Sequence, residues 1–229
     1  MHVYDEAIGH PDRPPEDVAR DASSRPREVL AFLAARPGMA VLDFQSGTGY
    51  FTELLSRVVG DAGKVYAHGH PGNSILGPEV YERRYGSARL PNTELILARH
   101  NELAPPAASL DAVLMSMVYH DTYWHDEHVD WGPVDRPALL ATLHRALRPA
   151  GTVLVIDHRA ESGSDPYRTA MAAHRIDPAI VVRDFTDAGF QLLEENHALA
   201  NAHDRRGADI FDDDVYRKTD RFMLLFGNP

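Results

Sequence analysis

Histidine and aspartate recur together at three places in the chain, each beside an apolar or helical segment. They are Tyr119, His120 and Asp121 after the apolar run 110–117, Asp157 and His158 after the run 152–156, and His174 ahead of an expected helix. Histidine suits a general base because its pKa lies near neutrality, and a neighbouring carboxylate orients the ring and raises its basicity. These residues predict a site of proton transfer if the fold brings the three places together.

Apolar segments and helical segments alternate along the chain, which indicates a parallel sheet covered on both faces. The expected strands are 39–44, 64–67, 94–98, 110–117, 152–156, 190–194 and 221–226. The expected helices are 15–36 with a break near Pro26, 50–59, 78–85, 135–147, and one from Asp177 to near Gly189. Only a loop joins the last two strands, so these should pair antiparallel. The sequence predicts an α/β fold: a doubly wound, mostly parallel seven-stranded sheet with an antiparallel C-terminal strand.

This fold accounts for the whole chain, 1–229, as a single domain. Residues 1–36 are expected to form an N-terminal arm and helices, with 1–14 as a loose arm. The segment 196–218 is long for a loop in a compact domain, so it is interpreted either as a lid or as a surface insertion. Because ligands bind beyond the carboxyl ends of parallel strands, the polar residues that follow 110–117 and 152–156 should meet at one edge.

A glycine turn lies between the first expected strand and the helix that follows it. Its candidate ligand-binding residues are Asp43, Gln45, Ser46, Gly47, Gly49 and Tyr50. Glycine lets the backbone turn sharply and leaves room for a ligand, and the free N–H groups of the following helix point toward that ligand. The turn predicts a cradle of the nucleotide-binding type, with Gln45 at a position where such loops usually carry glycine.

The composition excludes several other classes of function. The formal net charge is -11 over 229 residues, which argues against a nucleic-acid partner. The chain has no cysteine, so disulfides, thiolate nucleophiles and cysteine-bound zinc are absent. We expect no signal peptide, no membrane span and a cytoplasmic location. The expected partner is a small molecule, and a homodimer is compatible with the sequence.

The loop after 110–117 also contains side chains that bind metal ions. His120, Asp121, His125, Asp126, His128 and Asp130 lie within it, and His158 and His174 are expected nearby. Imidazole and carboxylate suit zinc, iron, manganese or nickel. Their spacing matches no compact signature such as H-E-x-x-H, so a divalent ion is an alternative and no metal ligand is predicted.

Four stretches of the sequence, in the same order along the chain as in the family, resemble class I S-adenosylmethionine-dependent methyltransferases. They are VLDFQSGTGYFTELLSRVVGDAGKVYA, SLDAVLMSMVYHD, LHRALRPAGTVLVIDH and FTDAGFQLLEE. More narrowly, RPPEDVARD and KTDRFMLLF are similar to pieces of a bacterial group of poorly characterised methyltransferases. The resemblance covers nearly the whole length and implies a Rossmann-like methyltransferase fold with S-adenosylmethionine as cofactor.

The resemblance also implies roles for single residues. Asp43, Gly47, Gly49 and the start of the Tyr50 helix match the loop that holds the amino-acid end of the cofactor. His68 stands where the family usually has an acidic residue that binds the ribose hydroxyls, and a neutral imidazole accepts only one such bond. Arg99 stands where many members have an acidic residue facing the adenine, so Asn101 or Glu102 is expected to substitute.

Together these observations predict methyl transfer from S-adenosylmethionine to an oxygen or nitrogen atom of a small molecule. His120 is the first candidate base, with Asp121 or Asp157 orienting it, and His158 and His174 are the next candidates. Tyr119, Tyr123 and Trp124 are expected to form a wall of the acceptor pocket. Two alternatives remain: a protein of this fold that binds a small ligand or metal without methyl transfer, and a metal-dependent enzyme of another class.

Overall fold

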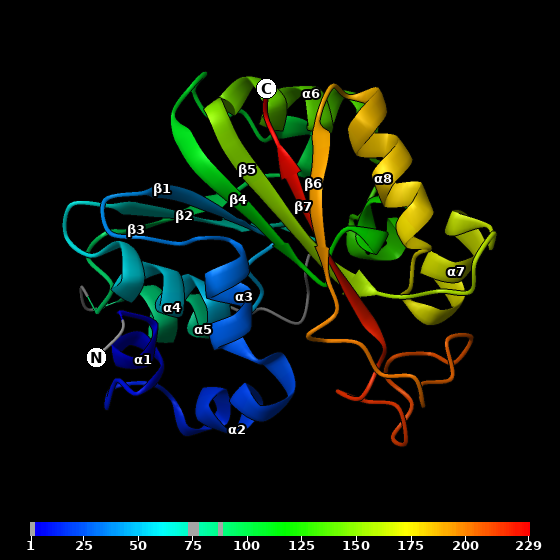
Figure 1. Ribbon diagram of the computed structural model, residues 1–229, viewed down its shortest axis with the longest axis horizontal. Coiled ribbons are helices and arrows are strands. Elements are labelled where there is room, and N and C mark those ends of the chain that lie inside the picture. Colours follow the sequence, from blue (N-terminus) through cyan, green and yellow to red (C-terminus); the bar gives the residue numbers. More distant parts are fainter. Residues whose placement is uncertain (1–2, 73–77, 87–88) are drawn as a thin grey trace.

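The computed structural model describes residues 3–72, 78–86 and 89–229, and its centre is a seven-stranded sheet (Figure 1). The strands are β1 (Ala40–Phe44), β2 (Lys64–Gly69), β3 (Thr93–Leu97), β4 (Leu110–Ser116), β5 (Leu147–His158), β6 (Gln191–Asn196) and β7 (Arg221–Gly227). Their order across the sheet is β3-β2-β1-β4-β5-β7-β6. The first five strands are parallel, while β7 is antiparallel to both β5 and β6. The fold class predicted from the sequence is confirmed, including the antiparallel terminal strands.

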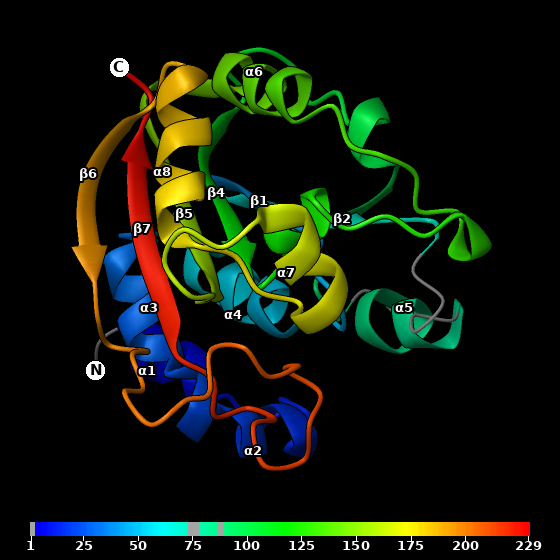
Figure 2. The same ribbon diagram turned by 90° about the vertical axis from the view of Figure 1, so that its right-hand side faces the viewer.

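Helices cover both faces of the sheet (Figures 1 and 2). They are α1 (Val3–Ile8), α2 (Pro15–Ser24), α3 (Pro26–Phe32), α4 (Tyr50–Val59), α5 (Pro78–Tyr85), α6 (Arg136–Ala146), α7 (Pro166–Ala173) and α8 (Pro178–Asp187), with short 3-10 turns η2 (His100–Glu102), η3 (His120–Thr122) and η4 (Glu127–Val129). One core lies under α1, α3 and α4, and the other lies under α6 and α8. The central strands are apolar on both faces because each face packs against helices.

Two helix boundaries show how the sequence fixes the elements. Asp135 caps α6 by accepting a hydrogen bond from the N–H of Ala138, as its position before Pro137 predicts. Asp177 caps α8 in the same way through the N–H of Ala179. The break near Pro26 is also confirmed, since Arg25 separates α2 from α3 with a left-handed φ of 45°.

The N-terminal segment differs from the sequence prediction. Residues 3–8 are not a loose arm but form α1, which packs against α3 and α4 and buries Tyr4 and Ala7. The spacing of Tyr4 and Ala7 puts both on one helix face, a signal too short to stand out beside the proline-rich residues that follow. Residues 1–2 lie outside the described part. The sequence also gave no indication of α7, which ends at His174.

The segment between β6 and β7 contains no helix or strand, and it lies beside α2 (Figure 2). It is nevertheless anchored, because Asp204 makes a fully buried ion pair with Arg175 at 2.6 Å and Arg25 donates a hydrogen bond to the carbonyl of Ala198. Leu199 and Val215 are buried. No helix in the described ranges combines the length and the apolar character needed to cross a membrane.

Candidate active site

A cavity of about 450 Å³ opens at the carboxyl edge of the sheet, where β1 and β4 end side by side. Its volume lies in the range of small-molecule sites, roughly 300–1,000 Å³. The residues that line it are Gln45, Gly47, Gly72, Met117, Val118, His120, Asp121, Trp124, Asp126, Val129, Trp131, His174, Ile210 and Phe211. The cavity thus brings the glycine turn after β1 together with the polar residues after β4 and the end of α7.

His120 is fixed by a carboxylate from the neighbouring strand. Asp157 ends β5 and is fully buried; its two oxygens accept hydrogen bonds from the backbone N–H and the ring Nδ1 of His120, at 2.8 and 2.7 Å. On the other side of the ring, Nε2 lies 3.1 Å from Oδ1 of Asp121. A carboxylate on Nδ1 sets the orientation of the imidazole and directs Nε2 outward. The orienting role predicted for Asp157 and Asp121 is compatible with this geometry.

These carboxylates decide the charge of His120. Burial by itself would lower its pKa, but the carboxylates of Asp157 and Asp121 and their hydrogen bonds raise the pKa to about 10. The ring is therefore an imidazolium at neutral pH.

His174 completes the cluster from a different part of the chain. It caps the C-terminus of α7 with a left-handed φ of 52°, and its ring centroid lies 5.6 Å from that of His120. Burial and the nearby charge of His120 lower the pKa of His174, so this ring is neutral. Ligand atoms of His120, Asp121 and His174 all lie within 4.8 Å of one another, a spacing that could hold a metal ion. His125 and His128, which belong to the same predicted metal loop, are exposed.

Tyr119 and His158, two of the predicted catalytic residues, do not line this cavity. Tyr119 is fully buried in the core and its hydroxyl donates to Asp184 at 2.9 Å, so it supports α8. His158 lies behind His120 and its Nδ1 pairs with the Thr219 hydroxyl at 2.7 Å. Burial holds the pKa of His158 well below its usual range. Their catalytic roles stay predictions, and the geometry gives them no place beside a ligand in this cavity.

At one of its two glycines, the glycine turn leaves space for a ligand to lie close to the backbone. Gly47 has φ 56° and a Cβ added to it would touch nothing within 4 Å, so its open side and the cavity that it lines are free for a ligand. Beside it, Asp43 is buried at the end of β1 and accepts a hydrogen bond from the Thr52 hydroxyl at 2.6 Å. Burial raises the pKa of Asp43 to about 7, although this hydrogen bond lowers it. Asp43 does not line the cavity, and the cofactor contacts expected of Asp43 and Gly47 stay predictions.

The second glycine is crowded by the protein itself. A Cβ on Gly49 would lie 2.8 Å from side-chain atoms of Arg84 and Tyr85, both from α5. Ser46 is 3.3 Å from the Tyr85 hydroxyl, and Tyr50 is buried with its hydroxyl donating to Asp21. Gly49 is therefore needed for the packing of α5 over the turn. The ligand contacts predicted for Ser46, Gly49 and Tyr50 stay predictions.

Gln45 and His68 make contacts inside the protein that the sequence did not indicate. Gln45 has a left-handed φ of 51°, and its side-chain Nε2 donates to Nε2 of His100 at 2.6 Å. His68 accepts from the N–H of Gln45 at 3.3 Å and donates from Nε2 to the carbonyl of Ala98 at 2.9 Å. Both ring nitrogens of His68 are thus occupied by backbone groups, and the predicted ribose contact would require one of these bonds to open.

The region beside this turn is filled by aromatic rings. His70 stacks on His100 with ring centroids 4.7 Å apart and packs against Trp131 at 4.2 Å. Burial lowers the pKa of His68 to about 4 and that of His100 to about 2, so both rings are neutral. Phe44 lies against His68 and His100. We call His68, His70 and His100 the neutral histidine cluster.

Asn101 and Glu102 lie in η2, on the exposed side of this cluster. Asn101 bridges two backbone groups: it donates to the carbonyl of Pro133 and accepts from the N–H of Asp135. Glu102 pairs with Arg99, which also pairs with Asp130. The adenine contact predicted for Asn101 or Glu102 stays a prediction.

Several lining residues escaped the sequence analysis. Met117, with a left-handed φ of 60°, follows β4, and Trp131 forms an isolated β-bridge with Asp126. Ile210 and Phe211 come from the segment between β6 and β7. The only signal for the last two was an apolar pair inside a long polar loop.

A doubly wound sheet with a glycine turn after β1 and a ligand-sized cavity over its carboxyl edge defines a protein of the nucleotide-cofactor-binding class. A model of the methyltransferase domain matches residues 18–207. The chain therefore belongs to the methyltransferase-domain family, and the resemblance found in the sequence is confirmed. S-adenosylmethionine is the cofactor of this family.

Curated relatives are bacterial enzymes of moderate similarity. The chain is 28% identical over 131 residues to the ubiquinone/menaquinone biosynthesis C-methyltransferase UbiE of Shewanella frigidimarina, covering 57% of this chain and 47% of that protein. It is 30% identical over 131 residues to UbiE of Vibrio campbellii, covering 57% and 46%. The matched part thus spans about half the length of these relatives.

Solved structures share the fold across the full sheet. An S-adenosylmethionine-dependent methyltransferase from Aquifex aeolicus matches with a TM-score of 0.62 and 20% identity over 100% of both chains. The [4+2]-cyclase SpnF matches with a TM-score of 0.62 and 16% identity over 91% of this chain and 81% of that one. At these identities the likeness shows the fold alone, and SpnF illustrates that the fold accommodates different reactions.

Proposed function

We propose that the chain transfers the methyl group of S-adenosylmethionine to an oxygen or nitrogen atom of a small molecule, and that the histidine–aspartate cluster removes the proton. The observation that carries this proposal is the shared cavity: Gly47 of the cofactor turn and His120, Asp121 and His174 line the same 450 Å³ space. An acceptor in this space would lie between the turn and the cluster. When bound, the cofactor supplies a methyl group on a positively charged sulfur.

The division of labour within the cluster follows from the hydrogen bonds. Both ring nitrogens of His120 face carboxylates, Asp157 at 2.7 Å and Asp121 at 3.1 Å. The described residues give the ring of His174 no hydrogen bond, and this ring lines the cavity. We therefore assign proton removal to His174 in place of His120, the first candidate from the sequence. His120 then holds Asp121 beside His174, and the lowered pKa of His174 supports its role as a neutral acceptor.

Replacing His174 tests this assignment. In the His174→Gln variant we expect turnover to fall about 10²- to 10⁴-fold, the usual contribution of a general base, with the affinity for S-adenosylmethionine unchanged. The assay follows transfer of an isotopically labelled methyl group to a panel of phenols, catechols and amines. His125→Gln is the matched control, because His125 is an exposed histidine outside the cavity.

The results separate the proposal from its alternatives. Equal turnover in wild type and His174→Gln would remove His174 from the mechanism. Cofactor binding without transfer to any acceptor would favour a binding protein, and activity that chelators abolish and added metal restores would favour a metal-dependent enzyme.

A second candidate is methylation at carbon, which the relatives named C-methyltransferases favour. A base that removes a phenolic proton also activates the adjacent ring carbon, so the same cluster serves either reaction. NMR spectroscopy of the methylated product distinguishes an O–CH₃ or N–CH₃ group from a C–CH₃ group.

We also propose a location, a lid and an oligomeric state for the enzyme. We place it in the cytoplasm and propose that the segment 196–218 acts as a lid, since Ile210 and Phe211 from this segment line the cavity. A homodimer is proposed through the edge strand β6, on which Leu192 and Leu193 are exposed. Light scattering of wild type and of Leu193→Glu measures this association.

A further inference from the structure

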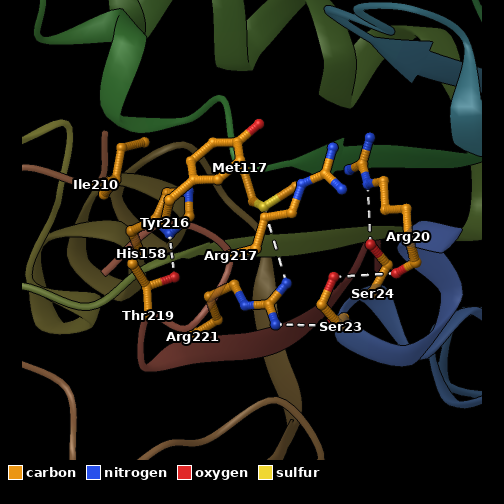
Figure 3. A pocket seen from close by; sticks show the side chains of 10 residues that line it. All are labelled: Arg20, Ser23, Ser24, Met117, His158, Ile210, Tyr216, Arg217, Thr219 and Arg221. Carbon is orange, nitrogen blue, oxygen red and sulfur yellow. Dashed lines mark hydrogen bonds between the residues drawn. The ribbon is translucent and has the colours of Figure 1, made fainter. Parts of the chain in front are cut away.

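A second cavity, of about 230 Å³, adjoins the main one where α2, the ends of β4 and β5, and the start of β7 meet (Figure 3). Met117 and Ile210 line both cavities, so the two spaces are neighbours. Three arginines line the smaller space: Arg20 from α2, Arg217 from the segment before β7, and Arg221 at the start of β7.

These arginines lack the carboxylate partners that buried arginines elsewhere in the chain have. Arg84, for example, pairs with Asp17 and Glu53, and Arg175 pairs with Asp204. Within residues 3–72, 78–86 and 89–229, Arg20, Arg217 and Arg221 form no ion pair with a carboxylate, and neither aspartate nor glutamate lines the cavity. The cavity is therefore cationic in a protein whose net charge is -11.

Arg221 is the most constrained of the three. Its exposed fraction is 8%, one Nη donates to the carbonyl of Ser23 at 2.6 Å, and the other lies 4.0 Å from the sulfur of Met117. Its buried Nε has no hydrogen-bond partner among the described residues. Burial, and then the charge of Arg20, lower the pKa of Arg221 to about 10. A buried guanidinium with an unused donor lacks an acceptor that would offset its desolvation.

Arg20 and Arg217 come from different parts of the chain, Arg20 from α2 and Arg217 from the segment that leads into β7. Nε of Arg20 donates to the Ser24 hydroxyl at 2.9 Å, and its guanidinium stacks 4.3 Å over the ring of Tyr50. Burial is the main cause of its lowered pKa, and the nearby charge of Arg217 lowers it further. Figure 3 shows the guanidinium groups of Arg20 and Arg217 near each other, with that of Arg221 apart from them and directed toward Ser23 and Met117. Like charges held together in this way favour a shared anionic ligand.

We propose that this cavity binds an oxyanion, a carboxylate or phosphate group, of the methyl acceptor. Guanidinium groups hold both kinds of oxyanion through paired hydrogen bonds. The buried hydroxyl of Ser24 accepts from Arg20, so its own proton is left to donate to the same anion. The acceptor is the favoured source because Arg221 is paired in register with His158 on β5. In the strand order β1-β4-β5-β7, it lies on the far side of β4 from the cofactor turn.

The inference rests on the proposed function only for the identity of the molecule that carries the anion. It predicts an acceptor with its reacting atom in the main cavity and its anionic group beside Met117, so neutral phenols and amines should be poorer acceptors than their carboxylated or phosphorylated counterparts.

The first experiment needs no acceptor. Inorganic phosphate is titrated into the full chain at constant ionic strength, with chloride as the compensating salt, and heat of binding and melting temperature are recorded. We expect saturable binding that weakens about tenfold or more in Arg217→Gln and in Arg221→Gln. Arg217 is exposed, so its variant remains informative if Arg221→Gln does not fold.

Arg205→Gln is the matched control, because Arg205 belongs to the same segment, pairs with Asp214 at the surface and does not line the cavity. Unchanged phosphate binding in this variant, with loss in Arg217→Gln, supports the site. No saturable phosphate binding to wild type, or equal loss in all variants, would overturn it.

A second titration identifies the source of the anion. If the acceptor supplies it, phosphate binds equally well to the free protein and to its complex with S-adenosylmethionine, and Arg217→Gln leaves the cofactor affinity unchanged. Displacement of phosphate by the cofactor would assign the cavity to the cofactor's carboxylate and overturn the proposal. Methyl transfer enters neither titration, so failure of the proposed function is recorded separately by the His174→Gln assay.

Discussion

At the carboxyl edge of the sheet, the neutral histidine cluster and His120 have opposite protonation states. In the neutral histidine cluster, the rings pack against Phe44 and Trp131. Their hydrogen-bond partners are backbone groups and the side chain of Gln45. His120, by contrast, lies between the carboxylates of Asp157 and Asp121. Burial lowers the pKa of all four rings, and only His120 has neighbouring carboxylates that reverse this effect.

The groups at the end of the neighbouring strand therefore decide whether a buried histidine of this protein is neutral or charged. The strand order places β5 beside β4, so a carboxylate at the end of β5 reaches His120. The ends of β2 and β3 bring only other imidazoles and carbonyl groups to His68. The histidine rings beside the glycine turn are therefore neutral, whereas the ring after β4 lies between two carboxylates.

Removing the carboxylate of Asp157 should have the largest effect on the pKa difference between His120 and the neutral histidine cluster. In chelator-treated Asp157→Asn we expect the pKa of His120 to fall from about 10 by about one to three units, because its strongest charge partner is gone. The fold should also lose about 3–5 kcal/mol of stability, since a buried ion pair is broken on one side. NMR titration of the His120 ring and chemical denaturation measure the two effects.

Asp184→Asn is the control for this substitution. Asp184 accepts hydrogen bonds from the Tyr119 and Tyr123 hydroxyls and does not contact His120. If both variants shift the titration of His120 equally, the charge of Asp157 is not the cause of the raised pKa. The explanation of the contrast between His120 and the neutral histidine cluster then fails.

The neutral cluster should reveal itself in acid. Because the folded-state pKa of His100 is about 2 and its unfolded value is near 6.5, the unfolded chain binds a proton that the folded chain does not. This group therefore lowers stability as the pH falls below about 6.5, by about 2 kcal/mol at pH 5 at 1.4 kcal/mol per pH unit. His120 has the opposite sign: its raised pKa adds stability below 6.5 that is lost as the pH rises toward 10.

His100→Phe keeps an aromatic ring and removes the proton-binding site. We expect the free energy of unfolding of this variant to fall less between pH 7.5 and pH 5 than that of wild type, as measured by urea denaturation at both values. His203→Phe serves as the control at an exposed position. An identical pH dependence in wild type and His100→Phe would show that His100 is not held neutral by the fold.

The sheet was predictable because its signals are local and repeated. The strand β4 has a continuous apolar run from Ala112 to Met115. Asp135 and Asp177 precede prolines at the starts of α6 and α8, and Gly60 ends α4, so a particular residue marks each of these helix boundaries. The pairing of His120 with Asp157 was within reach for the same reason: strand alternation sets which carboxyl ends meet.

The hydrogen-bond and ion-pair partners of the side chains at the site were not predictable. Nothing near His68 in the sequence indicates that the N–H of Gln45 and the carbonyl of Ala98 fill both its nitrogens. The cationic cavity combines Arg20 with Arg217 and Arg221, almost two hundred residues away, and the missing carboxylate near them is a property of three-dimensional packing. Contacts between distant segments depend on the exact path of loops, which residue periodicity does not encode.

The smallest effect is expected at Gln45, which joins the neutral cluster to the cofactor turn. Glycine adopts its left-handed φ of 51° without strain, whereas other residues there cost about 1–2 kcal/mol. Gln45→Gly also loses the hydrogen bond to His100, worth about 1 kcal/mol, so stability should change little. The affinity for S-adenosylmethionine should rise by about three- to tenfold, because the backbone becomes accessible to a closely bound ligand.

Gln45→Ala separates the two causes, because it removes the amide and keeps the backbone strain. Calorimetric titration of both variants with S-adenosylmethionine gives the answer. Tighter binding in Gln45→Gly alone means that the backbone conformation limits affinity. Tighter binding in both means that the bond between Gln45 and His100 keeps the cofactor side closed. Weaker binding in both would show that the amide of Gln45 contacts the cofactor directly, and the neutral cluster would then be part of the binding site and not packing beside it.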